Sequence, residues 1–155
     1  VYTAKTESFY LGKLTVLKDI LENEKNIPDE YYIDEAKDLK SWIKLKGSKN
    51  EIRVAKDGFE YKYTEGAMIF PDSLNKPSRT IVTGEGGKTP SRFKHVIRTK
   101  NGKLRRLTPL ELERLNMFPD NHTAGATDTK RAFFMGNALV VGVIEKLGQV
   151  LLKNI

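Results

Sequence analysis

The chain has 155 residues, carries 27 Lys and Arg against 20 Asp and Glu, and contains no cysteine. This length suits one domain or two small lobes, and the lack of a thiol excludes disulfides, thiolate metal ligands and a cysteine nucleophile within the chain. The sequence shows neither an apolar run of the ~20 residues that a membrane span needs nor the apolar core of a signal peptide at its start, so we expect a cytoplasmic protein without a membrane partner. Its first residue is Val1 and not Met, which suggests processing or a fragment of a longer protein.

Positive charge is concentrated in the middle of the chain. The formal net charge is +7, and no Asp or Glu lies between Lys88 and Arg106. This span holds eight cations: Lys88, Arg92, Lys94, Arg98, Lys100, Lys103, Arg105 and Arg106. Such a run on loops and a hairpin predicts contact with a polyanion such as the DNA backbone, while a merely solvated basic face is the alternative.

Apolar spacing predicts two short amphipathic helices near the start, over 14–21 and 36–43, separated by a turn at 26–28. Between Glu51 and Ile97 the chain is rich in β-branched and aromatic residues interrupted by Gly and Pro, which favours strands and exposed loops, including a strand at "SRTIVTG". Phe93, Val96 and Ile97 are expected to continue the same sheet. The "KNGK" segment predicts a hairpin with a type I′ turn.

Helical signals return in the last third. Thr108, Pro109 and Glu111 fit a capping box that starts a helix, and Pro119 follows its end. A further helical pattern runs from Asp128 to Leu152, with a break predicted at Gly136 and Asn137. The two histidines, His95 and His122, show no metal-ligand spacing, so we predict no metal site and expect both at the surface or in turns.

The stretch "VTGEGGKTPSR" is close to a phosphate-binding P-loop but does not match it. The P-loop pattern requires a glycine at position 82, where this chain has Val, and Pro90 follows Thr89 where a helix should start. A nucleotide hydrolase is therefore disfavoured. An independent hydrolase is disfavoured too, because the sequence suggests no nucleophile and base pair for one.

Three segments resemble the DNA (cytosine-5)-methyltransferases. "RRLTPLELERLNMFPDNHT" is similar to the ninth conserved block of that family, and "RAFFMGNALVVGVIEKLG" to the tenth. Ahead of both, "KPSRTIVTGEGG" resembles the part of the target-recognition domain built around a Thr-Leu or Thr-Ile dipeptide, here Thr80 and Ile81. The likeness is strong from Pro77 to Gly148 and weaker before it.

This resemblance implies an α+β fold in three regions: a helical lead-in over 1–50, a small β-rich target-recognition domain over 51–106, and a helical segment over 107–155. The last region would pack on a Rossmann-like catalytic domain that is missing here, so its apolar run "ALVVGVIEKLG" should be exposed in the isolated chain. The family's Gly-rich cofactor loop, its Pro-Cys nucleophile and its ring-binding Glu are all absent. We therefore expect no catalytic residue in this chain and a partner, domain or subunit, that carries the Pro-Cys block.

The resemblance also implies site residues. Thr80 would contact the DNA backbone, and the loop after it would enter a groove of double-stranded DNA. From their chemistry, Lys88, Arg92 and Lys94 suit guanine, and Glu85 suits the amino group of cytosine. The predicted DNA-binding residues are Thr80, Ile81, Thr83, Glu85, Gly86, Gly87, Lys88, Arg92 and Lys94.

The tenth block implies a cofactor, S-adenosylmethionine, bound in part by Asn137, Ala138 and Leu139. Arg105 or Arg106 would brace the recognition domain, and 63–68 would form an earlier recognition loop. The function implied is the DNA-recognition and cofactor-pocket portion of a bacterial or phage-encoded methyltransferase of a restriction-modification system. The alternative is a non-catalytic DNA-binding or regulatory remnant of such an enzyme.

Overall fold

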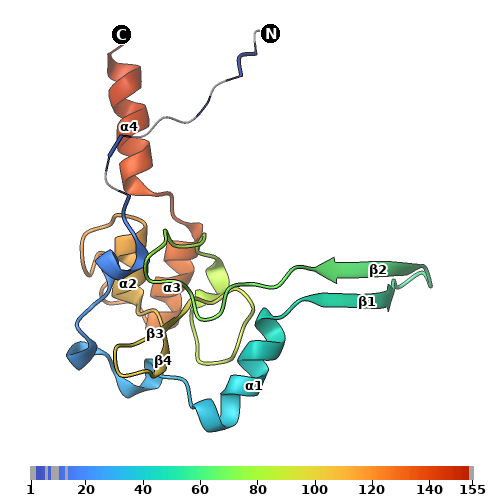
Figure 1. Ribbon diagram of the computed structural model, residues 1–155. Helices are drawn as coiled ribbons and strands as arrows, with labels where there is room; N and C mark the ends of the chain where they lie inside the picture. Colours follow the sequence, from blue (N-terminus) through green and yellow to red (C-terminus); the bar gives the residue numbers. More distant parts are fainter. Residues whose placement is uncertain (1–2, 6, 8–10, 13, 154–155) are drawn as a thin grey trace.

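The computed structural model describes residues 3–5, 7, 11–12 and 14–153 (Figure 1). Its helices and small antiparallel sheets are compatible with the predicted α+β class. In chain order they are η1 (Leu17–Ile20), η2 (Glu24–Asn26), η3 (Asp29–Tyr31), α1 (Glu35–Lys46), β1 (Lys49–Val54), β2 (Glu60–Glu65), η4 (Thr83–Glu85), β3 (Val96–Arg98), β4 (Leu104–Arg106), α2 (Pro109–Leu115), α3 (Asp128–Asn137) and α4 (Val141–Leu152), where η denotes a 3₁₀ helix.

The strands form two separate antiparallel hairpins. β1 pairs with β2 in a ribbon that projects from the rest of the molecule, whereas β3 and β4 lie inside it (Figure 1). The prediction that residues 93–97 continue the earlier sheet is therefore wrong. The strand predicted at "SRTIVTG" is also wrong, because residues 78–82 pair with no strand and lead directly into η4.

The hairpin predicted at "KNGK" is present, but its turn is not type I′. Gly102 has φ +83°, whereas Asn101 is not among the described residues with positive φ. The Thr99 amide donates to Lys103 O (2.8 Å), and the Gly102 amide donates to Thr99 O (3.0 Å). Three residues thus close the loop, which favours a type I turn followed by one left-handed residue.

The lead-in is less helical than its spacing predicted. Residues 14–21 contain only the four-residue 3₁₀ helix η1, while the second predicted helix is confirmed as α1. α1 starts at Asp34, whose side chain accepts from the Lys37 amide. Its last residue, Lys46, is buried.

Two apolar clusters hold these elements together. The larger one joins Leu17 and Ile20 of η1 to Ile97, Leu112 and Met135, so it links η1 to β3, α2 and α3. The smaller one packs Trp42 of α1 against Val96 and Leu104 of the inner hairpin. The inner hairpin therefore has apolar contacts on both sides, which fixes the loops that enter and leave it.

A buried ion pair joins β4 to α2. Thr108 caps α2 and forms the predicted capping box with Glu111. Glu111 also binds Arg105 through both carboxylate oxygens (2.8 and 2.7 Å), and the Glu22 amide donates to it at 3.0 Å. Glu111 is 0% and Arg105 1% exposed. This carboxylate thus connects the lead-in, the inner hairpin and α2.

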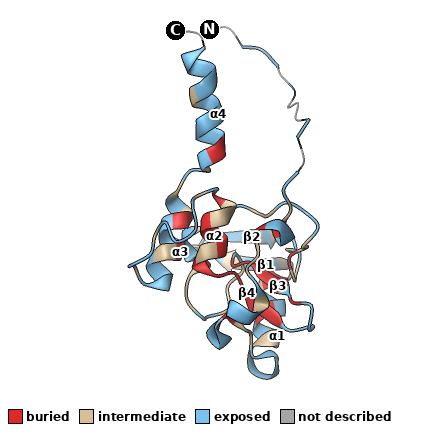
Figure 2. Cartoon of the chain, turned by 90° about the vertical axis from the view of Figure 1, so that its left-hand side faces the viewer, coloured by how far each residue is buried: buried red, intermediate tan, exposed pale blue. Residues whose placement is uncertain are grey.

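The C-terminal segment consists of two helices that meet at a break, as predicted. Ala138 and Val140 have extended backbone (ψ 154° and 112°) between α3 and α4. α3 packs against α2 and η4, whereas α4 projects away with most of its surface exposed (Figure 2). The predicted exposed apolar patch is confirmed on α4: Val143, Ile144, Leu147, Val150 and Leu151 are each 45–67% exposed.

The pair between Arg105 and Glu111 yields a stability prediction. Arg105→Met should lower the free energy of unfolding by about 3–5 kcal/mol, because it leaves a buried carboxylate without its counter-charge. Urea denaturation of both proteins measures this difference. Replacing both residues, as Arg105→Met/Glu111→Leu, should recover much of the loss, and a double variant as unstable as the single one would contradict the assignment.

Candidate nucleic-acid interface

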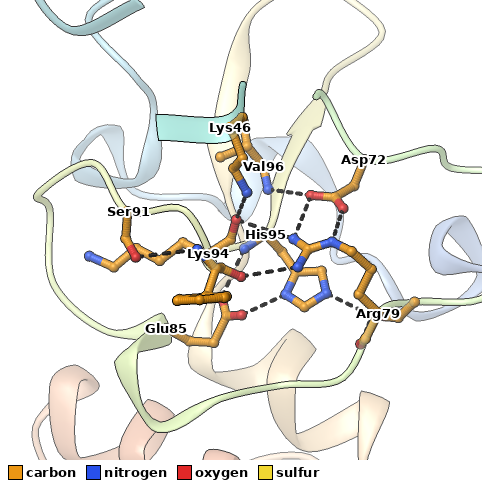
Figure 3. Close-up of polar contacts among 10 residues, drawn as sticks. Lys46, Asp72, Arg79, Glu85, Ser91, Lys94, His95 and Val96 are labelled. Carbon is orange, nitrogen blue, oxygen red and sulfur yellow. Dashed lines mark hydrogen bonds and ion pairs between the residues drawn. The ribbon is translucent and has the colours of Figure 1, made fainter. Parts of the chain in front are cut away.

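The segment 78–92, called the recognition loop below, lies between α3 and the inner hairpin. Its centre is the 3₁₀ turn η4, which contacts α3. Its two ends meet β3, where buried polar side chains hold them (Figure 3). The predicted DNA-binding residues therefore lie on a single loop, but they do not all face outward.

Glu85 is turned inward to His95. Its carboxylate accepts from the His95 amide (2.9 Å) and contacts His95 Nδ1 (2.7 Å), and His95 Nε2 lies 3.0 Å from Ser78 Oγ. His95 is 0% and Glu85 5% exposed. The expectation of a surface His95 is wrong, while His122 is exposed in a turn. In this arrangement Glu85 fixes the loop and is not available to cytosine.

Arg79 ties the start of the loop to its end. Its guanidinium binds Asp72 (2.7 and 3.2 Å) and donates to the carbonyls of Phe93 (3.2 Å) and Lys94 (3.3 Å) (Figure 3). Asp72 in turn accepts from the Val96 amide at 2.9 Å. Burial raises the pKa of Asp72, and its bonds to Arg79 and Val96 outweigh this, so the pKa is lowered overall and Asp72 is charged at neutral pH.

Two of the predicted base-reading cations also point into the protein. Lys94 is buried and donates to the carbonyls of Gly87 (2.9 Å) and Thr89 (2.7 Å). Arg92 donates to the carbonyls of Leu45 (3.0 Å) and Gly47 (2.9 Å) and pairs with Glu65 (3.3 Å). Arg92 thereby clamps the base of the projecting ribbon to α1, and Lys94 shapes the loop.

The residues left on the outer side are small or flexible. Thr80 and Thr83 are exposed, whereas Ile81 belongs to the core. The Lys88 side chain is 72% exposed and pairs with Glu30 at 3.2 Å. Gly87 has φ +78° and its carbonyl also accepts from Arg106 (2.8 Å), so an arginine does brace this loop, as predicted. Thr80, Thr83 and Lys88 are thus the predicted contacts that remain free to meet DNA.

The predicted cofactor residues lie where α3 ends. Asn137 and Leu139 are exposed, and Ala138 lines a cavity of about 490 Å³ together with Thr80, Met117 and Gly136. The Asn137 side chain donates through Nδ2 to Phe133 O at 2.9 Å, at an exposed position. The structure therefore brings part of the predicted cofactor site beside part of the predicted DNA site.

Two other kinds of site find little support. Among the described residues no cluster of three His, Asp or Glu side chains suits a metal ion. The stretch Asp128–Leu152 is long and apolar enough to cross a membrane by length and composition alone. Extended residues between α3 and α4 divide this stretch, and α3 begins with the charged residues Asp128, Lys130 and Arg131. The stretch is therefore not one continuous apolar helix.

Comparison with known proteins shows the family of this chain. The profile of the C-5 cytosine-specific DNA methylase family matches residues 2–153. The chain belongs to this family. It is 40% identical over 141 residues to the Type II methyltransferase M.Sau3AI of Staphylococcus aureus, an alignment that covers 91% of this chain and 33% of that protein. It is 27% identical over 143 residues to the Type II methyltransferase M.NlaX of Neisseria lactamica, with 90% and 39% covered.

The methylase chain thus spans between a third and two fifths of the length of these relatives. It contains no cysteine. Sequence reasoning did not identify Ser78, Asp72 and Arg79 as parts of this site. The "PSRT" stretch places Ser78 and Arg79 directly before Thr80, and this adjacency was the signal for these two residues. No sequence pattern indicated that His95 and Asp72 contact them.

Lys46 gives the site a testable pH dependence. Its ammonium donates to Lys94 O and lies 5.9 Å from the centre of the Trp42 ring. Burial, followed by the charge of Arg79, lowers the pKa of Lys46 to about 8. Between pH 8 and its ordinary pKa the unfolded chain binds more protons than the folded one, so stability rises with pH in this window.

We expect the lowered pKa of Lys46 to raise the free energy of unfolding by about 2–3 kcal/mol between pH 8 and pH 10, because each pH unit in this window adds about 1.36 kcal/mol. Lys46→Met should remove that gain, which urea denaturation at several pH values measures. Burial, and then Asp128, raises the pKa of Tyr31. Tyr31 therefore adds to the free energy of unfolding up to about pH 10, and this stabilisation is lost only above pH 10, where the tyrosine of the unfolded chain ionises. Parallel curves for both proteins would contradict the charge assignment of Lys46.

Proposed function

We propose that this chain is the DNA-recognition and cofactor-pocket portion of a DNA cytosine-5 methyltransferase, which transfers a methyl group from S-adenosylmethionine to C5 of a cytosine in a specific duplex site. The observation that carries the proposal is the alignment of almost the whole chain with one third of a Type II methyltransferase. The chain has no cysteine for the covalent step of that reaction. Alone it is therefore inactive, and a catalytic part with the Pro-Cys block completes it.

The recognition loop is the element that meets DNA. Thr80 and Thr83 offer hydroxyl groups at an exposed, internally braced segment, and Lys88 adds a flexible cation. Contacts of this kind to phosphate oxygens position a protein on a duplex. Arg92 and Lys94 support the loop from inside, and their role in DNA binding is therefore indirect.

The end of α3 supplies one wall of the cofactor pocket. The residues there fit such a role, because Asn137 is an exposed side chain whose amide oxygen is a hydrogen-bond acceptor and Leu139 offers apolar surface. The cofactor, when bound, supplies the methyl group. The rest of its pocket belongs to the catalytic part, because Asn137 and Leu139 are exposed and do not line the cavity beside Ala138.

α4 is the surface on which the catalytic part packs. Its apolar residues Val143, Ile144, Leu147, Val150 and Leu151 follow the spacing of one helical face. Each is exposed, because α4 is covered only at its start, where Gly142 is buried beside Met117, and then projects away from the rest of the described chain (Figure 2). An apolar surface of this kind on a water-soluble domain marks an interaction site.

Lys88 provides the test on the DNA side. Lys88→Ala should weaken binding to a duplex and reduce the slope of log K against log salt by about 0.9, the value for one phosphate contact. Lys37, whose side chain is 81% exposed on α1, gives the matched control Lys37→Ala, for which we expect no change. Fluorescence anisotropy at several salt concentrations measures both quantities, and an unchanged slope for Lys88→Ala would remove this contact.

Leu147 provides the test of assembly. The chain mixed with a catalytic part that carries the Pro-Cys block should transfer labelled methyl groups to duplex cytosine, and Leu147→Lys should weaken that assembly at least tenfold. Stability of the isolated chain should change by less than about 0.5 kcal/mol, because Leu147 is 58% exposed. Gln149→Lys, on the opposite side of α4, is the control. Intact DNA binding with no methyl transfer by any co-encoded partner would favour the non-catalytic remnant.

A further inference from the structure

Helix α3 and the recognition loop touch at a point where only glycine fits. A Cβ atom added to Gly136 would lie 2.3 Å from Thr83 N, 2.5 Å from Thr83 Cα and 2.5 Å from the carbonyl carbon of Val82. These are backbone atoms, so no side-chain rotation could relieve the overlap. The C-terminal end of α3 is therefore in direct contact with the backbone of the loop.

A second close contact lies near the other end of the same helix. A Cβ atom on Gly86 would lie 3.0 Å from Thr129 Cα, 3.1 Å from Thr129 O and 3.2 Å from Thr129 Cγ2. Thr129 and Gly136 are seven positions apart, which places them on one face of the helix, two turns and about 10 Å from each other. Two contacts at that separation fix both the position and the direction of segment 82–86 along α3.

The opposite side of this segment is fixed as well. Glu85, which lies between the two contact points, is held by the amide and the imidazole of His95 (2.9 and 2.7 Å). The loop is thus enclosed between α3 and the start of β3. Such a segment can be displaced only by moving the helix or by breaking the buried pair.

From this arrangement we infer that Gly136 is a positioning residue for DNA binding: with Gly86 it seats the recognition loop on α3, and the loop stays seated there when DNA is bound. The inference rests on the proposed function. It gives a glycine of the predicted cofactor block a role on the DNA side, through the placement of Thr80 and Thr83. One helix then sets both the predicted cofactor residues at its end and the predicted DNA contacts along its side.

Gly136→Ala tests the seating directly. An ordinary contact begins at 3.4 Å, so the loop backbone must retreat by about 1 Å, which is enough to break hydrogen bonds to phosphate. We expect at least a tenfold loss of affinity for a 20-base-pair duplex that the wild-type chain has selected from a randomised library. Gly148→Ala is the matched control, since a Cβ atom there meets nothing within 4 Å, and it should bind within twofold of wild type.

A cross-link tests the same inference without crowding at Gly136. The chain has no cysteine, so Gly86→Cys/Thr129→Cys introduces a single possible disulfide. Because the Gly86 Cβ position lies 3.0 Å from Thr129 Cα, the two Cα atoms are at most about 4.5 Å apart, which is the short end of the range for a disulfide, and the reduced variant reports the effect of the added side chains alone. If the loop binds DNA while seated on α3, the oxidised and reduced forms should bind the selected duplex within twofold of each other.

The outcomes separate the two levels of the proposal. If the wild-type chain selects no duplex, alone or with its catalytic part, the proposed function fails and the inference fails with it. If wild type binds and a folded Gly136→Ala binds equally well, only the inference is overturned. If Gly136→Ala does not fold, as judged by circular dichroism, the cross-link decides: loss of binding on oxidation shows that the loop must leave the helix, and retained binding supports its seating.

Discussion

Charged side chains that bind backbone carbonyls are the interactions on which the rest of this structure depends. The described chain forms only two short hairpins, so its long loops lack strand partners, and buried backbone groups must find other ones. Arg79, Arg92 and Arg106 each donate to carbonyls on segments far away in sequence. Lys46 does the same, whereas Lys94 binds carbonyls of the loop just before it. These contacts replace the hydrogen bonds that a larger sheet would provide.

This use of cations changes the meaning of the positive charge. Eight Lys and Arg residues lie between Lys88 and Arg106 without an acidic residue among them, which suggested a surface for polyanions. Arg92, Lys94, Arg105 and Arg106 instead point inward, to carbonyls or to Glu111. Charge counted along a chain therefore overestimates the charge available to DNA wherever loops need internal support.

Local patterns predicted local structure well. The capping box at Thr108, helix α1, the hairpin at Gly102 and the break after α3 all depend on residues close in sequence, and each is present. The α-helix predicted over 14–21 is absent, because only the four-residue 3₁₀ helix η1 forms there, and it is stabilised by contacts with the core rather than by helix length. The strand at "SRTIVTG" failed because β-propensity needs a neighbouring strand, and none lies beside it.

The candidate site could be predicted only in part, for the same physical reason. Thr80, Thr83 and Lys88 were predicted as DNA contacts from one segment, and they are exposed, while the contact with DNA stays a prediction. Glu85 and His95 are ten residues apart, and a buried pair at that spacing has no periodic signature. Whether a charged residue faces DNA or the protein depends on which distant carbonyls lie within its reach, and a sequence pattern does not contain that information.

The buried pairs also bear on how a duplex could be recognised. Flipping a base costs a few kcal/mol of stacking and pairing, which contacts from the recognition part must help to offset. A loop that orders only on binding would spend part of its contact energy on lost conformational entropy. Here the Glu85 and His95 pair, the Arg79 and Asp72 pair and the close approach to α3 fix the loop during folding. Under the proposed function, the energy of its contacts with DNA is then available for holding the duplex in the geometry that methyl transfer needs.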